Sequence, residues 1–360
     1  MSASGRLAVR LKAVPRAGNE DREREDAVAR APSSFDVAFD RVFRALAVAA
    51  AWGSMLLVVV VVYEIARSAA PAIARYGLGF IGEKTWDTNR ETFGILPQIF
   101  GTLYSSFLGL LLGAVFGVAI AIFLSERFFS SMLDSLLHAI GYGEHPVLGR
   151  LPDQLEAALK ITIELLAAIP SVVYGLWGIF VVIPMVRPMA DWLNSHLGWI
   201  PLFSTPLSGP GLLPAALVLA IMVLPTITAI SRDALVAVPP KLREAAFGLG
   251  ATRWEAILAV FVPTAATGIF GSIVLGFGRA LGETVALAML AGNANVVSWS
   301  LFSPCTTLAA LLANHFPEAG AVEVGALMYA ALVLLGITLL VNIAGAFVLQ
   351  RAEAGLKGLR

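Results

Sequence analysis

Six long apolar runs constrain the fold of this chain more than any other feature of its sequence. Each run approaches or exceeds the roughly 20 residues that an α-helix needs to cross about 30 Å of hydrocarbon. Because lipid offers the backbone no hydrogen-bond partner, each run is expected to be a helix. The sequence therefore predicts an all-α, polytopic membrane protein with six spans, near residues 43–66, 93–125, 158–184, 211–231, 264–292 and 324–350.

Composition agrees with a protein embedded in a lipid bilayer. Of the 360 residues, 58% are hydrophobic and only 14% are charged, against about a quarter charged in soluble domains. The formal net charge of zero argues against a nucleic-acid-binding protein. Cys305 is the only cysteine and the four histidines lack the spacing of metal ligands, so we expect no disulfide, no metal site and no cofactor.

The basic residues between the spans predict the orientation. If the N-terminus is inside, 19 Lys and Arg residues lie in cytoplasmic segments and 5 in outer loops, with Arg279 inside a span. Positive residues favour the cytoplasmic side, so both termini are predicted there. We expect residues 1–42 to be a mostly disordered tail, because they are polar and mixed in charge, and residues 351–360 to be a short cytoplasmic end.

The connection between the fourth and fifth spans, residues 232–263, is too long and too patterned to be a simple link. Pro239 and Pro240 can begin a helix, and Gly250 can end it. A second short amphipathic segment, residues 252–260, leads into the next span. We expect a helix, a glycine turn and a helix at the membrane surface, which would suit either a docking element or an interfacial helix.

Two charges interrupt the fifth span, within the stretch GRALGET. Arg279 and Glu283 are four residues apart, so on a continuous helix they share a face. Each costs about 2.5–3.5 kcal/mol near the bilayer centre. Arginine before glutamate is also the less favourable order for a helical pair. We therefore favour a translocation path in which Arg279 binds an oxyanion and Glu283 balances its charge, over a pair that only fixes helix register.

Part of the connection between spans four and five resembles the EAA motif of ABC importer permeases. The residues that carry this resemblance are Glu244, Ala245, Ala246, Gly250, Val260, Val262 and Pro263, and the two valines replace the isoleucine and leucine of the family pattern. The resemblance implies a coupling helix that lies in a groove of a cytoplasmic ATPase subunit. Glu244 would be its polar anchor, Ala245 and Ala246 would allow close approach, and Gly250 would make the turn.

Three further stretches resemble the permeases of phosphate ABC importers: residues 163–178, 243–257 and 275–287. The form GRALGET is similar to the PstC type of subunit rather than to its PstA-type sister. This resemblance implies a phosphate permease of the bacterial inner membrane that pairs with a sister permease, a cytoplasmic ATPase dimer and an extracytoplasmic phosphate-binding protein. The chain has no GxxxxGK[ST] sequence, so the ATPase would be a separate polypeptide.

Other functions are left open by the residues themselves. A permease for another oxyanion, such as molybdate or sulfate, would also use an arginine, because arginine reads charge better than identity. A proton-driven secondary transporter could use Glu283 but would not need an ATPase-docking loop. A membrane enzyme would need a cluster of candidate catalytic groups near one bilayer face, and the sequence suggests no catalytic residue.

Overall fold

The computed structural model describes residues 33–126, 128, 132–133, 139–140 and 151–357. The chain divides into two compact units, Met1–Val62 and Tyr63–Arg360. Most of the predicted disordered tail, residues 1–32, lies outside the described residues.

Helix α2 (Ser34–Tyr76) begins nine residues before the first predicted span. Its start is a reciprocal cap, in which the Ser33 hydroxyl accepts a hydrogen bond from the backbone N–H of Asp36 at 3.2 Å. The Asp36 carboxylate in turn accepts one from the backbone N–H of Ser33 at 3.2 Å. Because these bonds satisfy otherwise unpaired N–H groups, the helix starts at Ser34 and the predicted tail boundary at residue 42 is too late.

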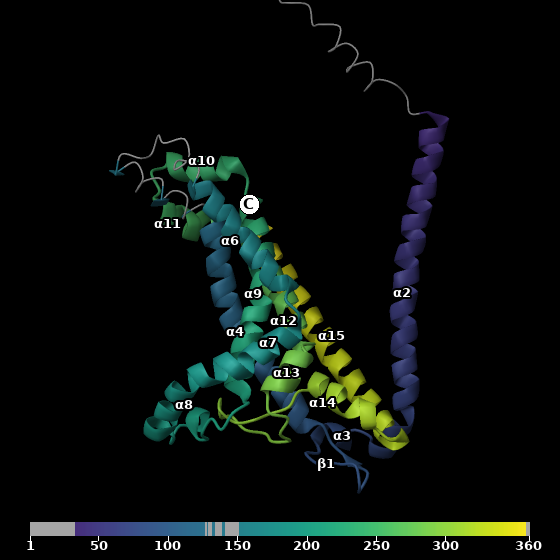
Figure 1. Cartoon of the computed structure of the whole chain (residues 1–360). Coiled ribbons are helices and arrows are strands. Elements are labelled where there is room, and N and C mark those ends of the chain that lie inside the picture. The colour runs from purple at the N-terminus through teal and green to yellow at the C-terminus, as the bar shows by residue number, and fades with distance from the viewer. Residues whose placement is uncertain (1–32, 127, 129–131, 134–138, 141–150, 358–360) are drawn as a thin grey trace, which may run out of the picture. The chain divides into compact units, whose positions relative to one another are not determined.

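The second unit is a helical bundle with one short hairpin (Figure 1). Its first elements are α3 (Gly79–Gly82), β1 (Trp86–Asp87), β2 (Thr92–Phe93), α4 (Leu96–Ser125), α6 (Leu151–Ala168), α7 (Ser171–Trp177), α8 (Ile183–Leu197) and α9 (Leu212–Val236). They are followed by α10 (Pro240–Gly248), α11 (Arg253–Ala256), α12 (Val262–Leu281), α13 (Val285–Leu290), α14 (Leu308–His315) and α15 (Ala321–Lys357). The two strands pair antiparallel, with Trp86 opposite Phe93.

Six helices among the described residues are long and apolar enough to cross a membrane, which confirms the predicted number of spans. They are Ser34–Tyr76, Leu96–Ser125, Ser171–Leu197, Leu212–Val236, Arg253–Leu281 and Ala321–Arg351. The last extends past the predicted boundary at residue 350, so the expected C-terminal segment begins as helix.

The third and fifth spans differ most from their predicted bounds. Residues 158–184 straddle a break, because α6 ends at Ala168 and α7 begins only at Ser171. Pro170 explains the break, since proline lacks a backbone N–H and disfavours helical geometry in the residue before it. The fifth span starts earlier than residue 264, because α11 continues into α12 through a π-helical turn, Ile257–Phe261.

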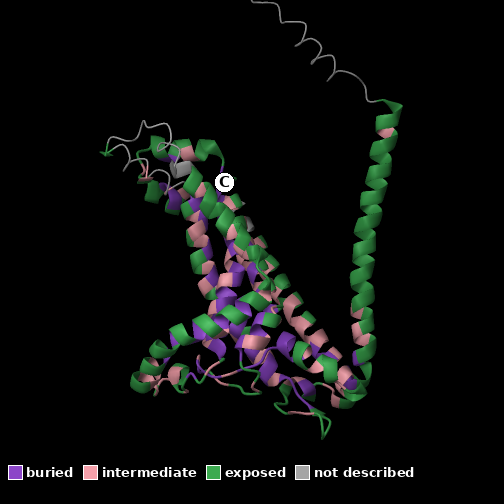
Figure 2. Cartoon of the chain, in the orientation of Figure 1, coloured by how far each residue is buried: buried purple, intermediate pink, exposed green. Residues whose placement is uncertain are grey.

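Helix α9 is the centre of the bundle. In its most apolar window 61% of the residues are buried, against 28% for α4 and 6% for α15. Figure 2 shows this buried zone running along the bundle interior. Glycines of α4 spaced four apart let the two helices approach closely, and the contacts join Gly109 to Leu219, Gly113 to Val223 and Gly117 to Ile227.

The two ends of the bundle carry different elements (Figure 1). α10, α11 and the C-terminal end of α15 lie at one end. The hairpin, α3, α8 and α14 lie at the other. The connection between spans four and five therefore shares its end of the bundle with the C-terminal end of α15.

Candidate functional site

The helix that carries Arg279 ends within the GRALGET stretch. α12 ends at Leu281, Gly282 is its C-cap, and α13 begins at Val285. The structure thus corrects the prediction of one helix over residues 264–292, with Arg279 and Glu283 one turn apart on a shared face. Glycine has low helix propensity, and local side-chain bonds compete with the helix here: the Thr284 hydroxyl donates to the carbonyl of Gly282 at 3.0 Å.

The break gives each charge a helix end of opposite partial charge. A helix carries partial negative charge at its C-terminus and partial positive charge at its N-terminus. Arg279 lies in the last turn of α12. Glu283 precedes α13, and its Oε1 accepts a hydrogen bond from the backbone N–H of Ala286 at 3.4 Å. Each such placement is worth about 0.3–1 kcal/mol at a surface and more when partly buried, so the order that is unfavourable on one helix is favourable across a break.

Arg279 has few polar contacts within the described part of the chain. The residue is exposed, and its one hydrogen bond among the described residues goes from Nη1 to the hydroxyl of Thr226 on α9, at a long 3.4 Å. The ion pairs found within the described ranges do not join it to Glu283, which is half-buried. Since a guanidinium has five N–H donors, most of them are available to a group outside this chain. Sequence reasoning missed Thr226, although it follows Pro225 within an apolar span.

The third span fixes the position of α13. A Cβ atom added at Gly175 of α7 would lie 2.6 Å from Sδ of Met289, and one at Gly178 would lie 2.6 Å from Cδ1 of Leu290. Such contacts are too close for a side chain, so the third span and α13 approach through these glycines. Gly278 and Gly282 make no such close approach among the described residues, because a Cβ at either would meet nothing nearer than 3.4 Å.

The connection between spans four and five contains a helix, α10, that ends in a glycine turn. Gly250 has φ +85°, a left-handed conformation that glycine adopts without strain. Its N–H donates to the carbonyl of Phe247 at 3.0 Å, and that of Ala251 donates to the carbonyl of Ala246 at 3.2 Å. These two bonds form the Schellman arrangement that ends a helix.

The structure separates the three residues of the EAA motif. Glu244 and Ala245 are exposed. Ala246 is only 6% exposed and packs with Leu235, Val238 and other apolar side chains beneath α10. Of these three residues, only Glu244 and Ala245 lie at the surface of the chain. Ala246 instead allows α10 to approach its own bundle.

Arg243 attaches α10 to three other segments, a role that sequence reasoning missed. Its Nη1 lies 2.7 Å from Oε1 of Glu126 at the end of α4, and that carboxylate is only 8% exposed. Its Nη2 donates to the carbonyl of Leu235 on α9 at 2.8 Å. Its guanidinium also lies over the ring of Phe261, 4.4 Å from the centroid. The available signal was an arginine directly before the EAA motif.

Metal binding has no visible basis in the described part of the chain. No group of three or more His, Cys, Asp or Glu side chains there could hold a metal ion. Cys305 is buried, and burial raises the pKa of its thiol to about 12. A thiol with this pKa stays protonated near neutral pH and is a poor nucleophile.

Comparison with known proteins identifies the relatives of this chain. Residues 147–353 match the family described as "Binding-protein-dependent transport system inner membrane component". The phosphate transport system permease protein PstC of Haemophilus influenzae is 39% identical over 290 residues, covering 78% of this chain and 84% of that protein. PstC of Mesorhizobium japonicum is 36% identical over 321 residues, covering 88% and 91%. A structure of the MetNI methionine ABC transporter is 16% identical, with a TM-score of 0.47, covering 72% of this chain and 95% of that one.

We predict that Arg243→Ala lowers the free energy of unfolding by about 2 kcal/mol, because it leaves the buried Glu126 carboxylate unpaired. Hydrogen exchange of the α10 amides should become faster, since α10 loses its attachment. Lys241→Ala, an exposed change on the same helix, is the matched control and should alter neither property. Unchanged thermal unfolding and unchanged α10 exchange in the Arg243 variant would rule out the anchoring role.

Proposed function

Because this chain belongs to the binding-protein-dependent transport system inner membrane components, and to the PstC permeases within them, we propose that it is a membrane subunit of an ATP-driven importer of inorganic phosphate. The observation that carries the proposal is the break in the fifth span. It presents an arginine on the surface of a membrane helix without an acidic partner among the described residues.

The positive charge of Arg279 would attract the phosphate anion first. The guanidinium can give two parallel N–H donors to two phosphate oxygens. Glu283, placed ahead of α13, can accept a hydrogen bond from a protonated phosphate oxygen and reduces the local positive charge when the path is empty. Two charges that do not pair with each other could each contact the ligand, which a direct ion pair would hinder.

The exposed surface of α10 would couple this path to ATP. Glu244 and Ala245 would contact a separate ATPase subunit, and Gly250 would make the turn behind them. The continuous helical run from Arg253 to Leu281 connects this element to Arg279. A movement imposed on α10 could therefore reach the charges through a single rigid element.

The remaining subunits follow from this mechanism. Arg279 is exposed on this chain, so a sister permease would close the other side of the path. A cytoplasmic ATPase dimer would dock at α10, and an extracytoplasmic phosphate-binding protein would deliver the ligand at the opposite end. The excess of Lys and Arg in the α10 connection and at both termini favours a cytoplasmic location for the α10 connection and the termini. The membrane would be the inner membrane of a bacterium.

We predict that Arg279→Gln and Glu283→Gln each reduce phosphate uptake at least about tenfold, which corresponds to one charge-assisted hydrogen bond of about 1.5 kcal/mol. Both variants should assemble normally, because Arg279 is exposed and a glutamine oxygen can still accept the hydrogen bond from Ala286. Uptake into proteoliposomes and subunit stoichiometry are the measurements. Arg187→Gln, in α8, is the control and should transport normally. Wild-type uptake by an assembled Arg279 or Glu283 variant would remove that residue from the path.

Two neighbouring alanines separate docking from folding. Ala245→Leu should abolish co-purification of the ATPase while leaving the melting temperature of the permease pair unchanged, because Ala245 is exposed. Ala246→Leu should lower that melting temperature, since overpacking a buried site costs about 1–3 kcal/mol. If Ala245→Leu retained the ATPase and its stimulation by the binding protein, α10 would not be the docking helix.

A further inference from the structure

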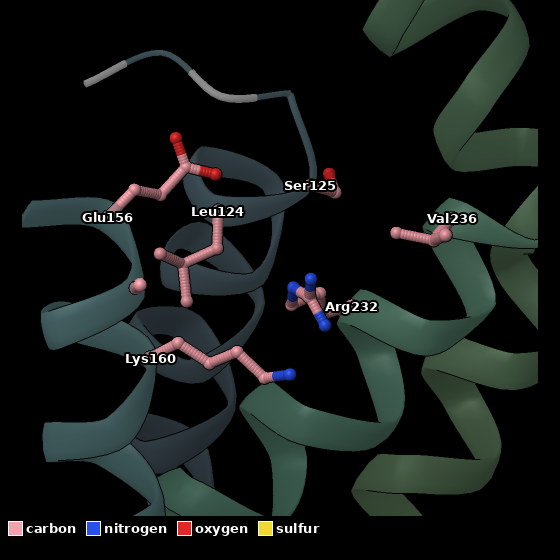
Figure 3. Close-up of a pocket in the computed structure, with 7 residues that line it drawn as sticks. Leu124, Ser125, Glu156, Lys160, Arg232 and Val236 are labelled. Carbon is pink, nitrogen blue, oxygen red and sulfur yellow. The ribbon is translucent and has the colours of Figure 1, made fainter. Parts of the chain in front are cut away.

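A second charged feature lies between α6 and the C-terminal turns of α4 and α9 (Figure 3). It is a hollow of about 430 Å³ whose walls include Leu124, Ser125, Glu156, Lys160, Arg232 and Val236. A smaller hollow of about 120 Å³ shares Leu124, Lys160 and Arg232 and continues along α9 to Thr228. Arg279 and Glu283 belong to neither.

The two cations of this hollow come from different helices and face the same space. Figure 3 shows the ammonium group of Lys160 reaching from α6 toward the guanidinium of Arg232 on α9. The carboxylate of Glu156, four residues nearer the N-terminus of α6, points away from that ammonium group. Like charges that converge in a partly enclosed space repel each other, so the arrangement favours an anion between them.

Each cation has a neighbouring acid, Glu164 or Asp233, at ion-pair distance but beyond hydrogen-bond distance. Lys160 Nζ lies 3.7 Å from Oε1 of Glu164, and Nη1 of Arg232 lies 3.6 Å from Oδ1 of Asp233. Charge-assisted hydrogen bonds are about 2.7–2.9 Å long, so both pairs are too long to be such bonds. The acids are also more exposed than their partners, at 58% against 48% for the first pair and 79% against 28% for the second. The N–H donors of both cations are thus open to a ligand.

We propose that Lys160 and Arg232 form a binding site for a phosphate-bearing anion, separate from the Arg279 segment. Arg232 would hold two phosphoryl oxygens with its planar fork, and Lys160 would supply a point charge from the opposite wall. The ligand is either inorganic phosphate or the phosphate of an anionic lipid headgroup. That the site lies on the release side of the membrane rests on the proposed function, whereas anion binding at the site does not.

The position of the hollow fits inorganic phosphate that has passed Arg279. Thr226, which contacts Arg279, precedes Arg232 by six residues on α9, or about 9 Å along the helix axis. The smaller hollow, which reaches Thr228, covers part of this interval. An anion leaving Arg279 toward the α10 end of the bundle would therefore meet Lys160 and Arg232 next.

A cysteine placed in the wall of the hollow tests the site without requiring transport. Ser125→Cys adds a thiol there, while buried Cys305, with its raised thiol pKa, should react slowly. The assembled transporter is placed in phosphatidylcholine nanodiscs and labelled with a negatively charged methanethiosulfonate, and modification of this chain is followed by mass spectrometry. Inorganic phosphate should slow labelling of the introduced thiol about threefold at constant ionic strength, and Lys160→Gln or Arg232→Gln should remove this protection.

Controls separate the two sources of phosphate and identify unspecific effects. Leu78→Cys, an exposed position at the other end of the bundle, should show no protection, and Arg351→Gln should leave the protection of the Ser125→Cys thiol intact. If phosphatidylglycerol in the nanodisc protects the Ser125→Cys thiol and inorganic phosphate does not, the ligand is a lipid headgroup. If neither protects, or if protection survives both Gln variants, the site does not exist.

The Arg279→Gln background should retain the protection, so failure of the transport path and failure of this site give different results.

Discussion

The constraint on which the site depends is the interruption of the fifth span after Leu281. A membrane helix can carry a charge only if something offsets the cost of removing that charge from water. Here the C-terminal end of α12 favours Arg279 and the N-terminal end of α13 favours Glu283, so neither charge needs the other. That independence leaves both groups able to bind a ligand, which a mutually satisfied ion pair could not do.

The rest of the bundle holds this interruption in place and connects it to the bundle end. Gly175 and Gly178 let the third span lie directly against α13, which fixes the position of Glu283. The helical run of 29 residues from Arg253 to Leu281 is about 43 Å long and joins Arg279 to the α10 connection. Arg243 attaches α10 to α4, α9 and the start of α12, so a force applied to α10 would move several spans together.

The sequence predicted the membrane class and the six spans, because long apolar runs leave clear patterns. It did not predict the break between Arg279 and Glu283, since periodicity continues across Gly282 and the apolar residues of α13 read as the same helix. The burial of Ala246 and the anchoring by Arg243 were also missed. Both depend on which face of α10 meets helices that are distant in sequence. The same holds for Lys160 and Arg232, which only the packing of α6 beside α9 brings together.

A charge exchange tests the central claim most directly. The double variant Arg279→Glu/Glu283→Arg keeps the net charge and would preserve an ion pair along a continuous helix, but it places each charge beside the wrong helix end and reverses the contacts offered to phosphate. We predict that the purified complex carrying this exchange shows no ATP-driven phosphate uptake in proteoliposomes. Uptake at the wild-type rate by the exchanged variant would contradict the account, because it would show that only the pairing of the two charges matters.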